Sequence, residues 1–237
     1  MNFEGKVVFI TGGSSGYGRA MAKKFTNEGA TVIIAARNEE ELIKAKNENV
    51  CQEYLKMDVT NSNNWEDAKK YVEENYGRID ILINNAGGGV AVVDTVDQTF
   101  ENIDKSISLN LNSVIYGSKV FGEMMKAQKS GTIINISSVC AKEAWPKFSV
   151  YAAAKWGVLG FSKGLYTELQ PYGVRVTCVI PASAATKFSS SAGLLETEHM
   201  LQTEDIAQAI YDICSLPEHV FVEETTIWGI DQVVNPL

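Results

Sequence analysis

The chain has 237 residues, of which 45% are apolar and 21% are charged, and its formal net charge is −8. This composition is typical of a globular protein with one sizeable core, and doubly wound α/β domains reach this length. The acidic balance argues against nucleic acids and anionic membranes as partners, because both attract basic surfaces. No apolar run approaches the roughly 18 residues of a membrane-spanning helix.

The cysteines indicate a reduced protein without a structural metal. Only two histidines accompany the four scattered cysteines, which are Cys51, Cys140, Cys178 and Cys214. No C-x-x-C pair is present, so neither a zinc site nor a disulfide framework is predicted. Residues 1–6 lack the basic and apolar regions of a signal peptide. A cytoplasmic protein with buried thiols is therefore expected.

Short apolar runs rich in β-branched residues alternate with amphipathic helical stretches. Strands are predicted at Lys6–Thr11, Thr31–Ala36, Val50–Met57, Ile79–Ile83, Thr132–Ile136, Arg175–Ile180 and Thr225–Trp228. Helices are predicted at Tyr17–Asn27, after the N-cap Asn38, and at Asn63–Tyr76, Phe100–Lys129, Val150–Tyr172 and Glu204–Leu216. This alternation predicts an α/β fold in which about seven parallel strands are flanked by helices on both faces. Because no linker interrupts it, residues 1–237 are expected to form one Rossmann-type doubly wound domain.

A glycine-rich turn joins the first predicted strand to the first helix. Residues 11–18 read Thr-Gly-Gly-Ser-Ser-Gly-Tyr-Gly. Gly12, Gly16 and Gly18 can provide a tight turn and a close backbone approach to a pyrophosphate at a helix N-terminus. Taken alone, the same glycines could form an ordinary strand-to-helix turn.

The spacing of Tyr151 and Lys155 indicates acid–base chemistry. Four residues apart, they share one face of a predicted helix. A nearby ammonium favours the phenolate and lowers a Tyr pKa from its usual value of about 10. Ser138 stands thirteen residues before Tyr151, at a strand end. An isolated Tyr-x-x-x-Lys pair is usually a surface feature, so the interpretation depends on the joint pattern.

In combination, these motifs resemble the short-chain dehydrogenase/reductase family over nearly the whole chain. Residues 11–18 match its T-G-x-x-x-G-x-G turn, residues 58–59 its adenine-contacting Asp-Val, and residues 84–87 its N-N-A-G. Asn110 matches the family's helix asparagine, and Ser138 precedes the Tyr-x-x-x-Lys at the family's spacing. Residues 181–186 match P-G-x-x-x-T, except that Ala182 replaces the glycine; if that backbone needs a positive φ, local strain is expected.

The resemblance implies a catalytic set of Asn110, Ser138, Tyr151 and Lys155. Tyr151 would be the general acid/base, and Lys155 would lower its pKa and bind the nicotinamide ribose. Ser138 would hold the substrate oxygen where charge develops. Asn110 would anchor a water that links Lys155 to solvent.

The resemblance also implies the contacts to a dinucleotide. The expected cofactor-binding residues are Gly12, Ser14, Ser15, Gly16, Tyr17, Arg37, Asn38, Asp58, Val59, Asn85, Ala86, Gly87, Tyr151, Lys155, Pro181, Ala184 and Thr186.

The end of the second strand favours NADP(H) as the cofactor. NAD-preferring enzymes usually place a carboxylate there, to bind the ribose 2′-hydroxyl. This chain has Ala36 followed by Arg37, which can bind a 2′-phosphate bidentately. Two features oppose this interpretation: Ser15 is neutral, and Glu39–Glu41 follow, although acids in the first turn of a helix also suit its dipole.

The substrate is expected to be a small carbonyl compound or alcohol that contacts Ser138, Trp145 and Tyr151. Trp145 and Phe148 would form an apolar wall, or would simply pack in the core. The nearby cations are Lys142, Lys147 and Lys187. If one of them points inward, a carboxylate or sulfonate substrate is expected; if none does, an uncharged ketone or aldehyde is favoured.

The predicted function is that of an NADP(H)-dependent oxidoreductase acting on CH–OH groups. The alternative is a non-catalytic dinucleotide-sensing protein, which could dispense with the Tyr or the Lys. An epimerase is disfavoured because no large C-terminal substrate domain follows.

A homo-oligomer, either a tetramer or a dimer, is also predicted. Two of the predicted helices are apolar beyond one face. The residues that suggest this are Val114, Ile115, Val120, Phe121, Val158, Leu159, Phe161 and Leu165.

Overall fold

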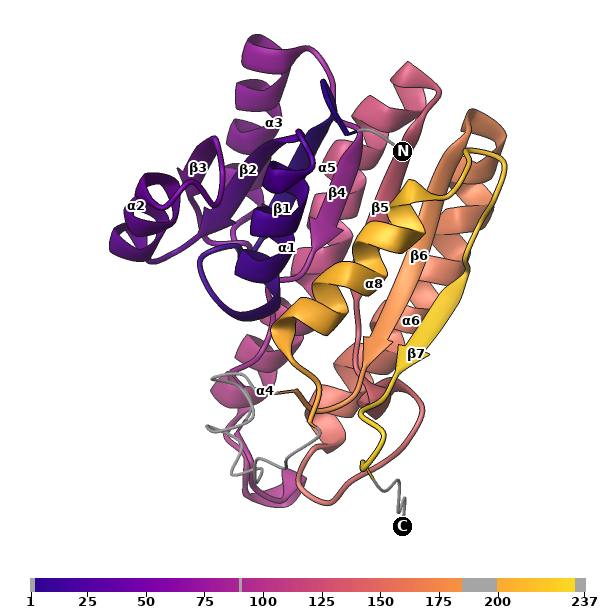
Figure 1. Cartoon of the computed structure of the whole chain (residues 1–237). Helices are drawn as coiled ribbons and strands as arrows, with labels where there is room; N and C mark the ends of the chain where they lie inside the picture. Colours follow the sequence, from indigo (N-terminus) through magenta and orange to yellow (C-terminus); the bar gives the residue numbers. More distant parts are fainter. Residues whose placement is uncertain (1–2, 90, 185–199, 233–237) are drawn as a thin grey trace.

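The computed structural model describes residues 3–89, 91–184 and 200–232. Its seven strands form one parallel sheet in the order β3-β2-β1-β4-β5-β6-β7 (Figure 1). The strands are β1 (Val7–Thr11), β2 (Thr31–Ala36), β3 (Glu53–Lys56), β4 (Ile81–Asn84), β5 (Gly131–Ile136), β6 (Val174–Pro181) and β7 (Glu224–Ile227). The main helices are α1 (Gly16–Asn27), α2 (Glu39–Asn47), α3 (Ser62–Tyr76), α4 (Phe100–Ile107), α5 (Ser113–Gln128), α6 (Ser149–Leu169) and α8 (Thr203–Ser215).

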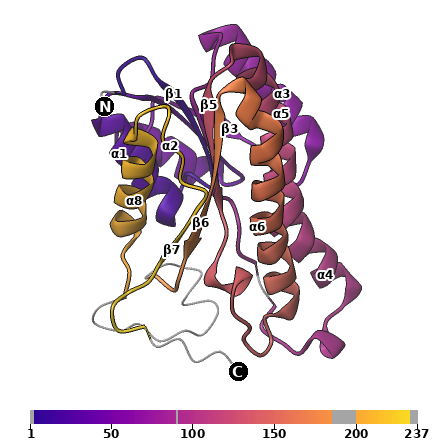
Figure 2. The ribbon, with the colours of Figure 1, turned by 90° about the vertical axis from the view of Figure 1, so that its right-hand side faces the viewer.

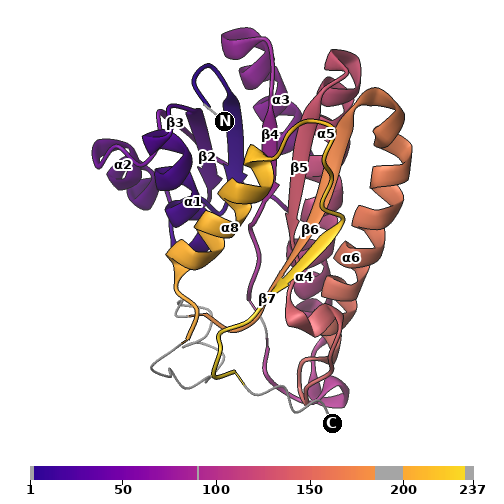
Figure 3. The ribbon, with the colours of Figure 1, turned by 45° about the vertical axis from the view of Figure 1, so that its right-hand side comes forward.

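Helices cover both faces of the sheet. Seen along the sheet edge, α1, α2 and α8 lie on one side, and α3, α5 and α6 lie on the other (Figure 2). The intermediate view shows α8 crossing the sheet beside α1 (Figure 3). The predicted doubly wound α/β fold with seven parallel strands is therefore confirmed.

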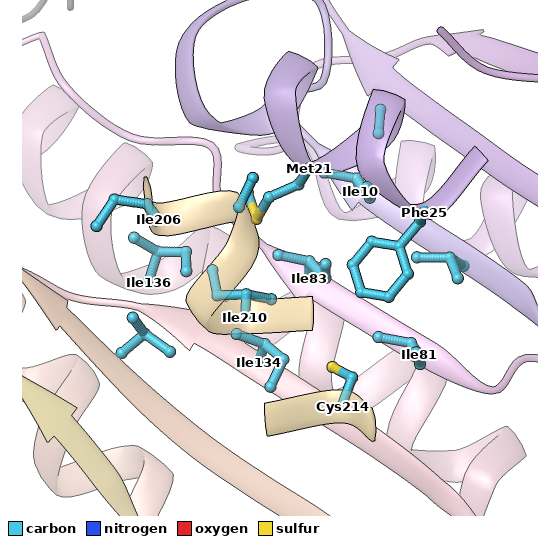
Figure 4. Packing of buried hydrophobic residues seen from close by; sticks show 14 of the residues in the cluster. Ile10, Met21, Phe25, Ile81, Ile83, Ile134, Ile136, Ile206, Ile210 and Cys214 are labelled. Atoms are coloured by element: carbon cyan, nitrogen blue, oxygen red, sulfur yellow. The ribbon is translucent and has the colours of Figure 1, made fainter. Parts of the chain in front are cut away.

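The core under α8 shows how the apolar pattern of the sequence is used. Ile210 of α8 lies beside Ile83 and Ile134 of the sheet, and Ile206 of α8 and Phe25 of α1 belong to the same cluster (Figure 4). All five side chains are fully buried. Burying one such side chain stabilises the fold by about 1.5–3 kcal/mol, so this layer fixes the position of the sheet on which the site is built.

Two strands, β3 and β4, begin two or more residues later than the sequence predicted. Ile79 was expected to begin a strand, but its backbone pairs with the side-chain amide of Gln128, with bonds of 2.9 and 2.7 Å, and β4 begins at Ile81. Val50 was also expected in a strand, but its N–H closes the end of α2 on Ala45. Apolar residues next to a strand are buried in both cases, so hydrophobicity alone could not mark where the ladder starts.

The predicted helix Phe100–Lys129 is divided by a π-helical turn. The turn, η2 (Ser108–Asn112), separates α4 from α5. It contains Asn110, whose side chain is fully buried. Single π-turns within α-helices are frequent at functional sites.

Helix α6 ends three residues before the predicted end. A 3₁₀ turn, η4 (Gln170–Tyr172), replaces its last turn, because Pro171 lacks the N–H that an α-helix needs.

Among the described residues, no helix is long and apolar enough to cross a membrane.

Candidate active site

The candidate site lies at the carboxyl edge of the sheet, where the strand order reverses. After β1 the chain leaves for β2 on one side, and β4 lies on the other side of β1. Thr11, Asn84, Ile136 and Pro181 end four of the strands at this edge. Such a switch point is where open α/β sheets bind ligands.

Close packing explains why the turn after β1 needs glycine. A Cβ on Gly18 would lie 2.2 Å from the Gly12 carbonyl oxygen, and one on Gly13 would lie 2.5 Å from the Cβ of Ile34. Gly12 has a φ of +66°, which favours glycine. Gly16 has a φ of +51°, and a Cβ there would meet nothing within 4 Å. The turn is thus closed toward the sheet and open at Gly16.

The start of α1 has the features of an anion-binding helix terminus. Its N-cap residue, Ser15, makes no side-chain cap hydrogen bond, and its first turn contains no acid. The next helix differs, because Asn38 caps α2 by accepting from the Glu41 N–H and three glutamates follow. Unsatisfied backbone N–H groups and the helix dipole attract phosphate. The exposed Ser15 and the half-buried Ser14 and Tyr17 therefore border a cradle that could bind a phosphate group.

Asn85 holds the glycine turn against the end of β4. Its side-chain N–H donates to the Thr11 carbonyl at 2.8 Å, and its backbone N–H donates to the Thr11 hydroxyl at 3.0 Å. The Ala86 N–H donates to the same hydroxyl at 3.0 Å. These bonds place residues 85–87 beside the glycine turn.

Arg37 is exposed directly beyond β2 and faces Asp58. Hydrogen bonds from the backbone and side chain of Thr60, followed by the charge of Arg37, lower the pKa of the Asp58 carboxyl. Ala36 places no carboxylate at the strand tip, so Arg37 can meet a phosphate there. Val59 next to Asp58 is buried, and its carbonyl accepts from the Trp65 indole at 2.8 Å.

The side chains of Ser138 and Tyr151 meet at the end of β5. Ser138 begins the 3₁₀ turn η3 (Val139–Ala141), and its hydroxyl accepts from the Cys140 N–H at 3.2 Å. Tyr151 lies in the first turn of α6 and is 7% exposed. Burial raises the pKa of Tyr151, the nearby Cys140 thiol raises it further, and a hydrogen bond with Ser138 opposes the rise.

Lys155 is almost fully buried, one helical turn beyond Tyr151. Its ammonium donates to the Ile136 carbonyl at 3.0 Å and lies 5.6 Å from the centroid of the Tyr151 ring. Burial lowers the pKa of Lys155 to about 8. Burial of the phenol dominates the pKa of Tyr151 in this state, and the expected lowering by Lys155 stays a prediction.

Asn110 binds the loop after β4 rather than the lysine itself. Its side chain accepts from the Gly88 N–H at 2.9 Å and donates to the Gly88 carbonyl at 2.9 Å. A Cβ on Gly87 would lie 3.1 Å from Asn110 Oδ1 and 3.4 Å from Lys155 Nζ. Asn110, Gly87 and Lys155 therefore converge on one point, as a water-mediated link would require.

The aromatic side chain of Phe148 borders Tyr151. The ring of Phe148 meets that of Tyr151 edge-on, with 6.4 Å between centroids, and Trp145 packs against the core while half-buried. Lys142 is paired with Glu224 at 2.7 Å, and Lys147 is exposed at a φ of +70°.

The segment after β6 is only partly described. Pro181 and Ala184 are buried beside the site, and Ala184 bridges to Leu201. Ala182 is not among the residues with positive φ, so the strain expected from its replacement of glycine is absent. The predicted sites Thr186, Lys187 and Phe188 lie outside the described residues.

Four residues of the site were missed or given no role by the sequence patterns. Gly13 and Gly88 stand beside glycines that were predicted, and only packing distinguishes them. Ser137 adjoins Ser138 and Cys140 follows it by two residues, and nothing else in the sequence marks either of them. None of the described residues forms a cluster of three or more His, Cys, Asp or Glu that could hold a metal.

Comparisons with known proteins show which family the chain resembles. A model of the short chain dehydrogenase family matches residues 6–195. An uncharacterized oxidoreductase of Staphylococcus epidermidis is 33% identical over 223 residues, which cover 94% of this chain and 96% of that protein.

Solved structures extend the likeness to the whole fold. The closed form of a serine dehydrogenase complexed with NADP+ has a TM-score of 0.91 and 27% identity, covering 98% of each chain. A metagenomic short-chain oxidoreductase in complex with NADP has a TM-score of 0.84 and 29% identity, covering 96% of this chain and 98% of that one. The matching family model and the similar relatives show that the chain belongs to the short-chain dehydrogenase family of oxidoreductases.

Proposed function

We propose that the protein uses NADP(H) to interconvert a carbonyl compound and its alcohol. The observation that carries the proposal is the convergence of Ser138, Tyr151 and Lys155 at the sheet edge that also holds the glycine turn. A nicotinamide cofactor, when bound, would supply or accept the hydride. The open face at Gly16 and the uncapped start of α1 fit its pyrophosphate.

The three side chains divide the proton chemistry. Because burial raises its pKa, Tyr151 is a neutral phenol at neutral pH and can donate its proton to a carbonyl oxygen. The Ser138 hydroxyl contacts Tyr151 and can bind the same oxygen as charge develops on it. With a pKa of about 8, Lys155 keeps most of its charge at pH 7, and its other N–H donors can serve a ribose.

Arg37 supports NADP(H) over NAD(H). It is exposed at the tip of β2 beside a carboxylate-free Ala36, where a 2′-phosphate would lie. Two similar structures, the serine dehydrogenase and the metagenomic enzyme, hold NADP+ or NADP.

The substrate is proposed to be a neutral ketone or aldehyde. Lys142 is engaged by Glu224, and Lys147 is exposed. Within the described ranges, Phe148, Cys140, Ser138 and Tyr17 lie near Tyr151, and these uncharged side chains favour an uncharged substrate.

A screen for NADPH oxidation over ketones, aldehydes and keto acids tests the function. Tyr151→Phe should lower kcat by at least about 100-fold, the usual contribution of general acid–base catalysis. Tyr166→Phe is the matched control, because Tyr166 lies on the same helix but stacks on Phe221 with ring centroids 3.7 Å apart. NADPH binding without turnover of any compound would instead favour a dinucleotide-sensing protein, and near-normal turnover by Tyr151→Phe would contradict the assignment.

The protein is further proposed to act as a cytoplasmic homo-oligomer. All four cysteines are buried and free, as a reducing compartment allows. Trp156 on α6 and Phe100 on α4 are 53% and 86% exposed, and large exposed apolar side chains favour an interface.

A further inference from the structure

Ser137 and Ser138 are neighbours, but their hydroxyls serve different parts of the molecule. Ser138 faces Tyr151. The Ser137 hydroxyl instead donates to the backbone carbonyl of Lys155 at 2.9 Å. Ser137 is 3% exposed, and its own N–H donates to the Val179 carbonyl at 2.8 Å, which fixes it to β6.

Two hydrogen bonds of opposite direction join Lys155 to consecutive residues. Ser137 donates to the lysine's backbone carbonyl, and the lysine's ammonium donates to the carbonyl of Ile136 at 3.0 Å. A lysine side chain is a flexible four-carbon stem, so its ammonium is held in one place only when both the backbone and the ammonium are fixed. Here both ends are fixed to the end of β5.

A buried polar cluster holds Ser137 from behind. The Cys178 thiol of β6 contacts the hydroxyls of both Ser137 and Ser162. The Ser162 hydroxyl donates to the Val158 carbonyl of α6 at 2.7 Å and accepts from the Asn135 amide at 2.9 Å. Helix α6 is therefore attached to the end of β5 through the Ser137–Lys155 bond and to β5 itself through the Asn135–Ser162 bond, and the Ser137 bond is the one that reaches the residue that carries the ammonium.

We propose that Ser137 is a positioning residue, which sets the place of the Lys155 ammonium relative to Tyr151. The inference rests on the proposed function, because it concerns the same lysine. Its expected effect is specific: without the Ser137 hydroxyl, the first turns of α6 move from the end of β5, and the ammonium loses part of its bond to Ile136. Since that bond favours the charged form, the pKa of Lys155 should fall.

The test is Ser137→Ala, measured in two ways. The kcat for carbonyl reduction should fall about tenfold or more, with little change in the KM for the carbonyl compound, because small displacements of a catalytic group lower rate more than binding. The pKa of Lys155, followed by NMR of ¹³C-labelled lysine and assigned with Lys155→Met, should fall by roughly half a unit. Tyr151, Cys140 and Cys178 are the titratable groups that face the ammonium, and their titrations should be recorded in the same spectra.

Two variants separate positioning from general stability. Thr177→Val removes an equally buried hydroxyl–carbonyl bond, which Thr177 of β6 donates to Val222 at 2.7 Å, and should leave both kcat and the pKa of Lys155 unchanged. Ser137→Thr keeps the hydroxyl and should restore both. If Ser137→Ala does not fold, Ser137→Cys, a weaker donor, is measured in its place.

The inference is overturned if Ser137→Ala leaves the pKa of Lys155 unchanged or higher, or if Thr177→Val has the same effect on it. The NMR titration needs no turnover. If the wild-type protein reduces no carbonyl compound, the proposed function fails, while the titration still decides the role of Ser137.

Discussion

The Lys155 ammonium lies 5.6 Å from the centroid of the Tyr151 ring, on the same face of α6. Both groups are buried, and burial moves their pKa values in opposite directions, because it disfavours a charged lysine and a charged phenolate alike. At neutral pH the pair is therefore an ammonium beside a neutral phenol. This is the protonation state that a carbonyl reduction needs.

The pH dependence of reduction should follow Lys155. Its pKa is about 8 and that of Tyr151 is raised, so the lysine loses its proton first as the pH increases. We expect kcat for reduction to be level between pH 6 and 7, because the lysine is mostly protonated at a pH roughly one unit below its pKa. The kcat should decline as the pH rises through about 8. A rate that stays level far above that pKa would contradict this assignment.

Lys155 should also lower the stability of the fold at neutral pH. Its folded-state pKa of about 8 lies below the ordinary 10.5. Between these values only the unfolded chain holds the proton, so the wild-type protein gains stability as the pH rises through this window. Below it, the buried charge carries a penalty on the order of 3 kcal/mol.

Replacing Lys155 with methionine removes that charge and keeps the volume. At pH 7, Lys155→Met should be more stable than wild type, because it avoids the penalty on the buried charge. The lost bond to the Ile136 carbonyl reduces this gain by about 1 kcal/mol. The advantage should shrink as the pH rises through the window. Urea unfolding near pH 7 and near the upper end of the window measures it, and a difference that does not change with pH would rule out the explanation.

Much of this site could be predicted from the sequence because its motifs are local. The spacing of Tyr151 and Lys155 places them on one helical face, and the glycines at the end of β1 predict a turn whatever the tertiary structure. The sheet and its helices also followed from short-range apolar patterns. Arg37 at a strand tip needed only the strand boundary, which β-branched residues marked well.

The remainder depends on contacts between distant residues. The π-turn carries Asn110, whose side chain pairs with Gly88, twenty-two residues earlier in the chain. The start of β4 is set by the amide of Gln128, and the pKa of Tyr151 by burial that no motif reports. Several residues that suggested an oligomer, among them Phe121 and Val158, are buried in the core of this chain.

Cofactor selectivity should depend on Arg37. Arg37→Asp, or the pair Ala36→Asp with Arg37→Ile, should shift the preference toward NADH by tenfold or more, since a charge-assisted bond is worth roughly 1.5–3 kcal/mol. The ratio of kcat/KM for NADPH and NADH measures the shift. Lys44→Ala is the control, because Lys44 is an exposed cation farther along α2. A wild-type preference for NADH would show that Arg37 does not bind a phosphate.

The glycine turn should tolerate no side chain at Gly18. A Cβ there would lie 2.2 Å from a backbone oxygen, so the turn itself must move. Gly18→Ala should lower the free energy of unfolding by at least about 1–3 kcal/mol, as overpacking does, and should weaken dinucleotide binding. Gly122→Ala, within α5, is the matched control. Its Cβ would lie at an ordinary 3.5 Å from Leu169, and the substitution should stabilise the helix by about 0.8–1.0 kcal/mol. Equal effects of the two changes on urea unfolding would contradict the packing argument.

The assembly should respond to charge on α6. Trp156 is 53% exposed in the single chain, and a homo-oligomer would cover it. Light scattering should therefore give a multiple of the 25.9 kDa chain mass, and Trp156→Glu should reduce that multiple. Trp145→Phe serves as a control for loss of a tryptophan, because Trp145 packs within the chain. A wild-type species of one chain mass at micromolar concentration would exclude the oligomer.

The substrate should be uncharged. With Lys142 held by Glu224 and Lys147 exposed, the described wall near Tyr151 offers the ring of Phe148 rather than a second cation. A neutral ketone should therefore have a higher kcat/KM than a keto acid of the same size. If the keto acid is preferred and Lys147→Ala or Lys187→Ala removes that preference, a cation binds its carboxylate through a charge-assisted bond. The substrate proposal would then be wrong, while the roles of Ser138 and Tyr151 would stand, since both compounds present the same carbonyl.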